Sequence, residues 1–489
     1  MEIKIIKKSQ TPIYKQVQNQ IKELIQNGEL VEGLLLPSER RLADMTAIHR
    51  NTITKAYQGL KAEGYIESFK GKGYKVVYSI AYPLNTFTSA KHGSIPWYYL
   101  MRDDLLEYKI SFDDLFSKSY SRRGISFAGG IVPPEVYYKD DIKKILKDII
   151  ESEIEDIFEY SPYQGLFKLR QTICSRLRTR GINATPNEIQ VVNETNHAND
   201  YISELFIKPG DFVITEEPLS PDIYRTFKLS GANIITVPLE NDGIRIDIVE
   251  ASIIKNNPKF IYVSSSYNDP TGIIMSLEKR KRLLEISNKY KVPIIEDDSA
   301  SEIRFTENNI PSIKSLDKMG SVIYIYSFAL TYAPGIKLAY ILAPKQVIKK
   351  ISYLLSMHMV NLDSINQSIL CKYMESGLYD TNLKRICRCY QEKRDLMCNL
   401  LEDIQNDHIE FKKPLGGVYL WCKISEKVSM SKLVKLVYRR GVYLIPGSLF
   451  FPNGNKGDNY IRLNFSYPST NDIRVGIDIL SETLKESSI

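Results

Sequence analysis

Long apolar runs are missing from this sequence: no segment of its 489 residues approaches the ~20 apolar residues that span a bilayer. The first residues, MEIKIIKKSQTPIY, also lack the apolar core of a secretory signal. A hydrophobic content of 43% and a charged content of 25% are typical of soluble globular proteins. We therefore expect a cytoplasmic protein, and the length predicts two or three domains.

Cysteine is scarce, with six scattered residues. Only Cys387 and Cys389 lie close together, in a charged, helix-like stretch without a second cysteine pair or a histidine cluster at ligand spacing. The sequence thus predicts reduced thiols and no metal site.

Positive charge is concentrated at one end of the chain. Residues 1–78 contain 13 Lys and Arg against 8 Asp and Glu, a net charge of +5, whereas the rest of the chain carries only +2. A small basic head on a near-neutral body is the pattern of a polyanion-binding module. Chance clustering of surface lysines would give the same count, so charge alone leaves both interpretations open.

The head has the pattern of short helices followed by a hairpin. Leu36-Pro37-Ser38-Glu39 supplies a proline, a serine cap and a first-turn acid, which together predict a helix start. The predicted elements are helices over 12–27, 39–46 and 50–63, and strands over 65–69 and 74–77 joined by a basic turn. The third helix should turn Ile53, Ala56, Tyr57 and Leu60 inward. This arrangement indicates a winged helix-turn-helix.

Polar side chains at the amino end of the third helix suit a major groove: Arg50, Asn51, Thr52 and Lys55. Arginine pairs with guanine edges or phosphate, and asparagine with adenine. Lys70 and Lys72 in the turn suit phosphate or the minor groove. The alternative is a helical protein–protein module.

The stretch LPSERRLADMTAIHRNTITKAYQGLKAEGYIESFKGKGYKV resembles the DNA-binding domain of the GntR regulators over its whole length. PSER, RNT, AEGYI and the GKG wing carry this resemblance. It implies that Arg40, Arg50, Asn51 and the wing contact DNA. Residues 79–124 follow as a linker with a looser pattern, and a connection of this length predicts a tether or a docking arm.

From about residue 125 the pattern becomes alternating strands and helices. The continuous apolar runs are typical of a mainly parallel sheet buried on both faces: 212–214, 234–237, 260–263, 292–295 and 322–325. Ligands bind beyond the carboxyl ends of such strands.

The body resembles fold-type I pyridoxal-phosphate (PLP) enzymes and, more narrowly, the MocR subgroup of GntR regulators. Its shared motifs include YSPYQG at 160–165, Pro270-Thr271-Gly272, Ile295-Glu296-Asp297-Asp298 and Ala333-Pro334-Gly335. The resemblance implies an α/β body in which a large domain over 125–375, with a mainly parallel seven-stranded sheet, precedes a small C-terminal α/β subdomain over 376–489. It also implies a head-to-tail homodimer with a pocket near the subunit boundary.

PLP chemistry needs a lysine for the Schiff base, a carboxylate for the pyridinium nitrogen and donors for the phosphate. The family's lysine lies in a stretch like SFSKTLAPG, and this chain reads SFALTYAPG with Leu330 at the lysine's place. Leucine cannot form an aldimine. The resemblance aligns four further positions with lost cofactor contacts: Lys337 for the phosphate arginine, Glu194 for the loop glycine, Ser220 for the stacking aromatic ring and Ser299 for the tyrosine at the ring hydroxyl. Asp297 and Arg462 stand where the family has its ring acid and its substrate-carboxylate arginine.

We expect a DNA-binding transcription regulator, active on duplex DNA as a homodimer, whose body is a pseudo-aminotransferase rather than an enzyme. The alternatives are a regulator that holds PLP noncovalently through Asp297, Thr195 and Lys337, and a working aminotransferase with a DNA-binding head. Lys337 could also act as a displaced Schiff-base lysine, and Asp297 and Arg462 could serve structural ion pairs. If the pocket binds an effector, we expect a small carboxylate at Arg462 with a cationic or neutral tail toward Glu194.

Overall fold

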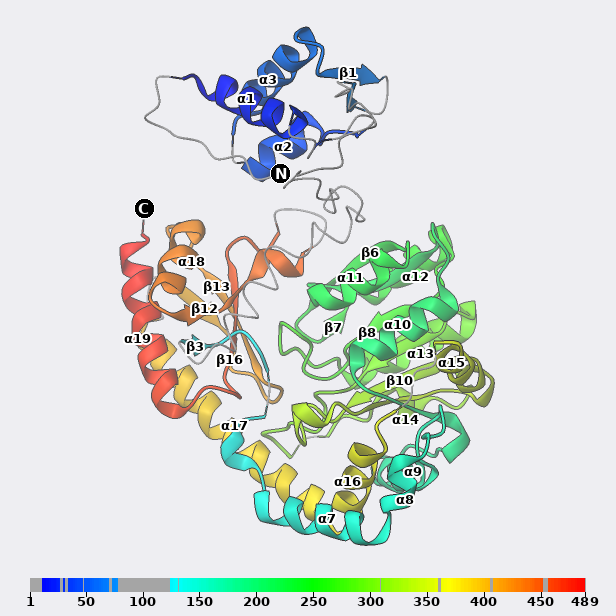
Figure 1. Ribbon diagram of the computed structural model, residues 1–489. Helices are drawn as coiled ribbons and strands as arrows, with labels where there is room; N and C mark the ends of the chain where they lie inside the picture. Colours follow the sequence, from blue (N-terminus) through cyan, green and yellow to red (C-terminus); the bar gives the residue numbers. More distant parts are fainter. Residues whose placement is uncertain are drawn as a thin grey trace. The chain divides into compact units, whose positions relative to one another are not determined.

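The computed structural model describes residues 11–26, 30, 34–46, 48–69, 73–77, 124–130, 132–307, 309–358, 362–404, 408–451 and 456–488 (Figure 1). The chain divides into two compact units, residues 1–109 and 110–489, and each is described by itself. Most of the predicted linker over 79–124, and both wing lysines, Lys70 and Lys72, lie outside the described residues.

The first unit contains three helices and a two-stranded antiparallel sheet: α1 (Ile13–Gln26), α2 (Glu39–Thr46), α3 (Arg50–Ala62), β1 (Ile66–Phe69) and β2 (Gly73–Val76). The predicted winged helix-turn-helix is confirmed. The four apolar residues predicted to face inward from α3 are buried in one core with α1, α2 and the hairpin. Ser38 caps α2 as expected, since its Oγ accepts from the Arg41 backbone N–H at 3.2 Å.

The second unit is built on an eight-stranded sheet with the order β4-β11-β10-β9-β8-β5-β6-β7. Its strands are β4 (Ile189–Val192), β5 (Phe212–Glu217), β6 (Asn233–Glu240), β7 (Gly243–Ile244), β8 (Ile261–Val263), β9 (Ile294–Asp297), β10 (Val322–Ser327) and β11 (Ala339–Leu342). All five predicted apolar strands are present, and β11 runs antiparallel to both of its neighbours. The eighth strand is the two-residue β7, which pairs antiparallel with β6.

Helices cover both faces of this sheet. Val213 and Ile214 follow each other on β5 and point to opposite faces, so they belong to different cores. The core on the Val213 side contains residues of α10 (Thr195–Phe206), α11 (Pro221–Leu229) and α15 (Lys345–Met357). The core on the Ile214 side contains residues of α12 (Ile246–Asn256), α13 (Leu277–Tyr290) and α14 (Ile313–Leu316).

A third core lies around one end of the sheet. It contains residues of α7 (Lys139–Ser152), α9 (Phe167–Thr179) and α16 (Ser364–Glu375), together with β4, β10 and β11. The short helix α8 (Ile154–Phe158) connects α7 toward α9. Single 3-10 turns occur at η1 (Pro134–Val136), η2 (Pro186–Glu188), η3 (Pro334–Ile336) and η4 (Gly447–Phe450).

The C-terminal subdomain follows the 25-residue helix α17 (Leu378–Glu402), which leads from the large domain into it (Figure 1). An antiparallel sheet with the order β12-β13-β16-β15 packs with α18 (Met430–Arg439) and α19 (Thr470–Glu486). The strands are β12 (Ile409–Phe411), β13 (Tyr419–Ile424), β15 (Ile445–Pro446) and β16 (Tyr460–Asn464).

The first residues of the body, which the sequence analysis assigned to the large domain, pack with the C-terminal subdomain instead. Strand β3 (Ile125–Ser126) pairs in parallel with β14 (Val442–Tyr443), and Phe127 and Val136 are buried in the core of the C-terminal subdomain. The segment from 125 to 136 therefore packs with the C-terminal subdomain although it precedes the large domain in sequence.

None of the described helices combines the length and apolar composition that crossing a membrane requires. The six cysteines form no disulfide, and among the described residues no three acidic, histidine or cysteine side chains gather as metal ligands would.

Candidate functional site

The carboxyl ends of four neighbouring strands meet at a cavity of about 230 Å³. Asp297 ends β9 and Ser327 ends β10, Ser264 follows β8, and Glu216 lies one residue before the end of β5. Helix α10 starts there with Thr195. This is the place that the alternating strand–helix pattern predicted for a ligand.

Asp297 lines this cavity as expected. Its carboxylate accepts hydrogen bonds from the Tyr262 hydroxyl at 3.0 Å, the Ser299 hydroxyl at 2.6 Å and the Ser299 backbone N–H at 3.1 Å. Burial raises the pKa of Asp297 above its ordinary value, while these hydrogen bonds oppose the shift. Ser299 therefore stabilises the charged form of the Asp297 carboxylate, and both residues lie in the cavity wall.

Glu216 is a second acid in the wall and is buried, and the sequence analysis did not single it out. Its carboxyl accepts from the Ser264 backbone N–H at 2.8 Å and the Asn268 side-chain amide at 3.0 Å. Burial raises the pKa of Glu216 to about 8, so this side chain is mainly protonated at neutral pH. A glutamate near the end of an apolar strand was the only sign of this residue in the sequence. Whether that glutamate is buried depends on the tertiary packing.

Leu330 lies in the cavity wall, at the place predicted from its alignment with the family's lysine. It also packs against the core of the C-terminal subdomain. The described residues that line the cavity include four acids, Glu216, Asp222, Asp269 and Asp297, and no lysine, arginine or histidine.

Ser220 occupies the N-cap position of α11 and lines the same cavity. Thr195 lines it from the first turn of α10. The structure thus brings both side chains to the wall of the cavity that contains Asp297.

Lys337 and Glu194 depart from the expected pocket, because neither lines the cavity. The Lys337 Nζ lies 3.2 Å from Glu194 Oε1, and the two side chains are 64% and 40% exposed. Glu194 occupies the position before α10, and Lys337 has a left-handed backbone with φ of 50°. The two charges neutralise each other outside the cavity.

Arg462 also differs from the expectation that it would hold a ligand carboxylate. It lies on β16, is 3% exposed and does not line the cavity. Its Nη1 donates to both carboxylate oxygens of Asp269 at 2.7 and 2.9 Å, and its Nη2 donates to the Ala128 carbonyl at 2.7 Å. Tyr419 lies against the guanidinium at 4.1 Å. Asp269, which the sequence analysis did not single out, therefore supplies from within the chain the carboxylate that was expected from a ligand.

In the first unit, the residues predicted to contact DNA lie together at the start of α3 and on α2. Arg40, Arg50, Asn51 and Lys55 are exposed and Thr52 is half-buried. The Arg50 Nη2 lies 3.8 Å from Glu39, and the Lys55 ammonium lies over the Tyr14 ring at 4.2 Å.

His49 caps α3, because its Nδ1 accepts a hydrogen bond from the Asn51 backbone N–H at 3.3 Å. The sequence analysis did not predict this cap. This contact fixes the end of α3 that carries the polar residues.

Comparison with known families agrees with this two-part structure. The model of aminotransferase class I and II matches residues 135–480. The chain belongs to this aminotransferase family. A second model, of bacterial regulatory proteins of the gntR family, matches residues 13–76, so a GntR helix-turn-helix precedes the aminotransferase domain in the MocR-type arrangement.

Several proteins resemble the chain over most of its length. The HTH-type transcriptional regulator YisV of Bacillus subtilis, which is described as uncharacterized, is 26% identical over 480 residues, covering 98% of this chain and 97% of YisV. Aromatic-amino-acid aminotransferase 1 of Thermococcus litoralis is 30% identical over 368 residues, covering 74% of this chain and 88% of that enzyme. The structure of Pyrococcus horikoshii kynurenine aminotransferase superposes with a TM-score of 0.73 at 27% identity, covering 79% and 97% of the two chains.

Proposed function

We propose that this protein is a DNA-binding transcription regulator whose aminotransferase-like domain forms a homodimer and transfers no amino groups. The observation that carries the proposal is the exposure of Arg50, Asn51 and Lys55 together on α3 of the winged helix-turn-helix. A polar, cationic helix start is the element that enters a major groove in this fold.

The aminotransferase fold implies PLP, and the residues present fit a covalently held PLP poorly. Leu330 lines the cavity where the resemblance expects the Schiff-base lysine, and the described lining contains no other lysine. Lys337, the candidate for a displaced lysine, pairs with Glu194 outside the cavity. These contacts support a domain that forms no aldimine.

Asp297 favours a second candidate, a regulator that binds PLP noncovalently. Its half-buried carboxylate lies in the cavity wall and could accept from a pyridinium nitrogen. In this case the cofactor would be exchangeable, and a spectrum of the purified protein would contain absorbance that dialysis removes.

A homodimer is supported by exposed apolar side chains on consecutive elements near the start of the body. Ile150 on α7, Phe158 on α8, Tyr160 and Phe167 are 57%, 84%, 92% and 54% exposed. Large apolar patches on a single chain are typical of protein–protein interfaces. We place the subunit boundary on this surface.

The experiment that tests the proposal has two measurements on the full chain. In the first, labelled duplex DNA from upstream of the protein's own gene is titrated with protein at several salt concentrations; we expect binding that weakens steeply with salt. In the second, the protein is incubated with PLP, reduced with borohydride and examined by peptide mass spectrometry. We expect no pyridoxyl adduct at any single lysine. A stoichiometric adduct, at Lys337 or elsewhere, would contradict the loss of PLP chemistry without touching the DNA result.

A further inference from the structure

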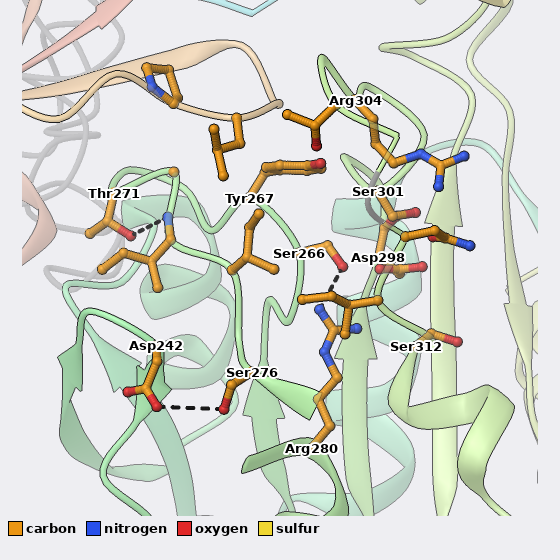
Figure 2. Close-up of a pocket in the computed structure, with 18 of the residues that line it drawn as sticks. Asp242, Ser266, Tyr267, Thr271, Ser276, Arg280, Asp298, Ser301, Arg304 and Ser312 are labelled. Atoms are coloured by element: carbon orange, nitrogen blue, oxygen red, sulfur yellow. Dashed lines mark hydrogen bonds between the residues drawn. The ribbon is translucent and has the colours of Figure 1, made fainter. Parts of the chain in front are cut away.

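A second cavity, of about 400 Å³, lies beside the one at Asp297 and is the larger of the two. Tyr267 and Ser266 line both, so the Tyr267 side chain forms part of the partition between them. Figure 2 shows the second cavity with Tyr267 above Ser266 in its middle and with Arg304, Ser301 and Asp298 along one wall. None of the residues predicted to contact the cofactor lines this second cavity.

Backbone contacts hold this second cavity in shape. The Gly417 N–H donates to the Ile303 carbonyl at 2.9 Å, and the Phe305 N–H donates to the Leu415 carbonyl at 3.0 Å. A Cβ at Gly416 would come within 2.3 Å of both the Ile303 carbonyl oxygen and the Tyr267 ring, so only glycine allows this approach. The loop with Arg304 is therefore joined to the loop with Pro414 and Leu415, and residues of both loops line the cavity.

Most of the cationic groups in the wall are already paired. The Arg180 Nη2 donates to Asp298 at 2.6 Å, and Arg280, fully buried, donates to carbonyls of Met275, Pro311 and Ser265. Lys413 lies 2.7 Å from Asp395. Arg304 differs, because its half-buried guanidinium has no hydrogen-bond or ion-pair partner among the described residues.

Asp298 offers an unused acceptor in the same wall. Its Oδ2 accepts from Arg180 and from the Tyr324 hydroxyl at 3.0 Å. Its Oδ1 is buried and has no hydrogen-bond donor within the described part of the chain. A buried carboxylate oxygen without a donor is costly, so a ligand donor at this position would be stabilising.

We propose that this cavity binds a small zwitterion of the amino-acid type with an apolar side chain. Arg304 takes the carboxylate, for which its planar fork is suited, and Asp298 Oδ1 accepts from the ammonium group. The apolar side chain packs on Tyr267, Ile310 and Leu415, which all line the cavity. The site is separate from the cavity at Asp297, so the inference holds whether or not that cavity takes PLP.

Calorimetric titration of the full chain with L-phenylalanine tests the proposal, with 3-phenylpropionate and phenethylamine as probes that lack the ammonium and the carboxylate. We expect L-phenylalanine to bind, and each of the other two to bind about tenfold more weakly or worse. Altering the ligand avoids a change at Asp298, whose loss would also leave Arg180 unpaired.

Three variants locate the site. Arg304→Gln should weaken L-phenylalanine binding at least about tenfold. Arg388→Gln removes an arginine whose side chain is 83% exposed and paired with Glu392. Asp297→Asn alters the neighbouring cavity. Both variants should bind L-phenylalanine as tightly as the wild type does. No binding of L-phenylalanine to the wild type at millimolar concentrations would overturn the proposal. Loss of binding in Asp297→Asn with retention in Arg304→Gln would overturn it as well, since the molecule would then occupy the other cavity.

Discussion

Two cationic side chains of the aminotransferase-like domain hold carboxylates of the chain itself. Arg462 binds Asp269 through both oxygens, and Lys337 pairs with Glu194. In each pair the acid takes the place at which an anionic group of a cofactor or substrate was expected. At the scale of single residues, two cations that were expected to hold ligand groups pair with acids of the chain itself.

Replacing Asp269 should therefore create a response to carboxylates that the wild type lacks. Asp269→Asn leaves the buried Arg462 without its counter-charge, and we expect a loss of about 3 kcal/mol in the free energy of unfolding. Millimolar succinate should restore part of this stability by binding Arg462 in the folded state only. Thermal unfolding with and without succinate measures both effects.

Asp222→Asn is the matched control for this experiment. Asp222 lines the same cavity but pairs with the partly exposed Arg225, so its loss should have a small effect and no succinate response. Equal stabilisation of wild type and Asp269→Asn by succinate would show that Arg462 is not the group that responds.

Glu216 gives a prediction about pH. Its pKa is raised to about 8 by burial, so the folded state keeps a proton that the unfolded chain releases near pH 4.5. The contribution of this group to stability is complete below pH 4.5 and is lost as the pH rises to about 8. Glu216→Gln keeps both hydrogen bonds and removes the titration, so its stability should fall less over this range.

Urea denaturation of wild type and Glu216→Gln at several pH values tests this sign. We expect the difference in free energy of unfolding to grow in favour of the variant, by roughly 1 to 3 kcal/mol between pH 5 and pH 8. Glu296, whose pKa burial raises to about 7, titrates in both proteins and cancels in the comparison. A difference independent of pH would mean that Glu216 is ionised in the folded protein.

At the scale of elements, one face of α3 packs into the core of the first unit and the other presents the side chains predicted to contact DNA. Its inner face, with Ile53, Tyr57 and Leu60, is fully buried, and the opposite face leaves Arg50 and Asn51 exposed. The Tyr57 hydroxyl donates to the Pro37 carbonyl at 2.8 Å, which ties α3 to the start of α2. The recognition side chains thus project from a helix that its own core holds in place.

Arg50→Ala should weaken binding to a specific DNA site by about 1 to 3 kcal/mol and relax the base preference at one position. Lys61→Ala, on the exposed last turn of the same helix, removes an equal charge and should change affinity much less. Competition binding with single-base operator variants separates the two outcomes. An equal loss for both variants would indicate a general charge effect rather than base recognition by α3.

At the scale of the whole molecule, dimerisation would let two winged heads read paired half-sites. The exposed apolar side chains of α7, α8 and the following loop are the surface on which we place the interface. Replacing Phe158 and Tyr160 together by serine should shift the sedimentation coefficient from dimer to monomer and reduce affinity for paired half-sites.

Met319→Ser serves as the control, because this side chain is 67% exposed and lies between α14 and β10, outside the elements that form that surface. It should leave the dimer intact. A double variant that sediments like the wild type would place the subunit interface elsewhere.

Much of the architecture follows from local pattern. Residues 39–46 were predicted as a helix and form α2 with the same bounds, because the cap and the apolar spacing lie within the segment itself. The five apolar runs became strands of the large sheet for a similar reason, since strands buried on both faces need continuous apolar residues. The positions of Asp297, Leu330 and Ser220 in one cavity were also predictable, through resemblance to a fold that gathers strand ends.

The sequence by itself therefore determined the two parts of the chain, most of their secondary structure and some of the residues around one pocket. Only the tertiary structure decided which charges meet. Asp269 and Arg462 lie 193 positions apart, and β3 joins β14 from the far end of the body. Such pairings depend on distances of a few ångström between side chains brought together by the whole fold, which neither spacing nor periodicity encodes. For the same reason, the unpartnered Arg304 and the orphaned oxygen of Asp298 became visible only when their neighbours were in place.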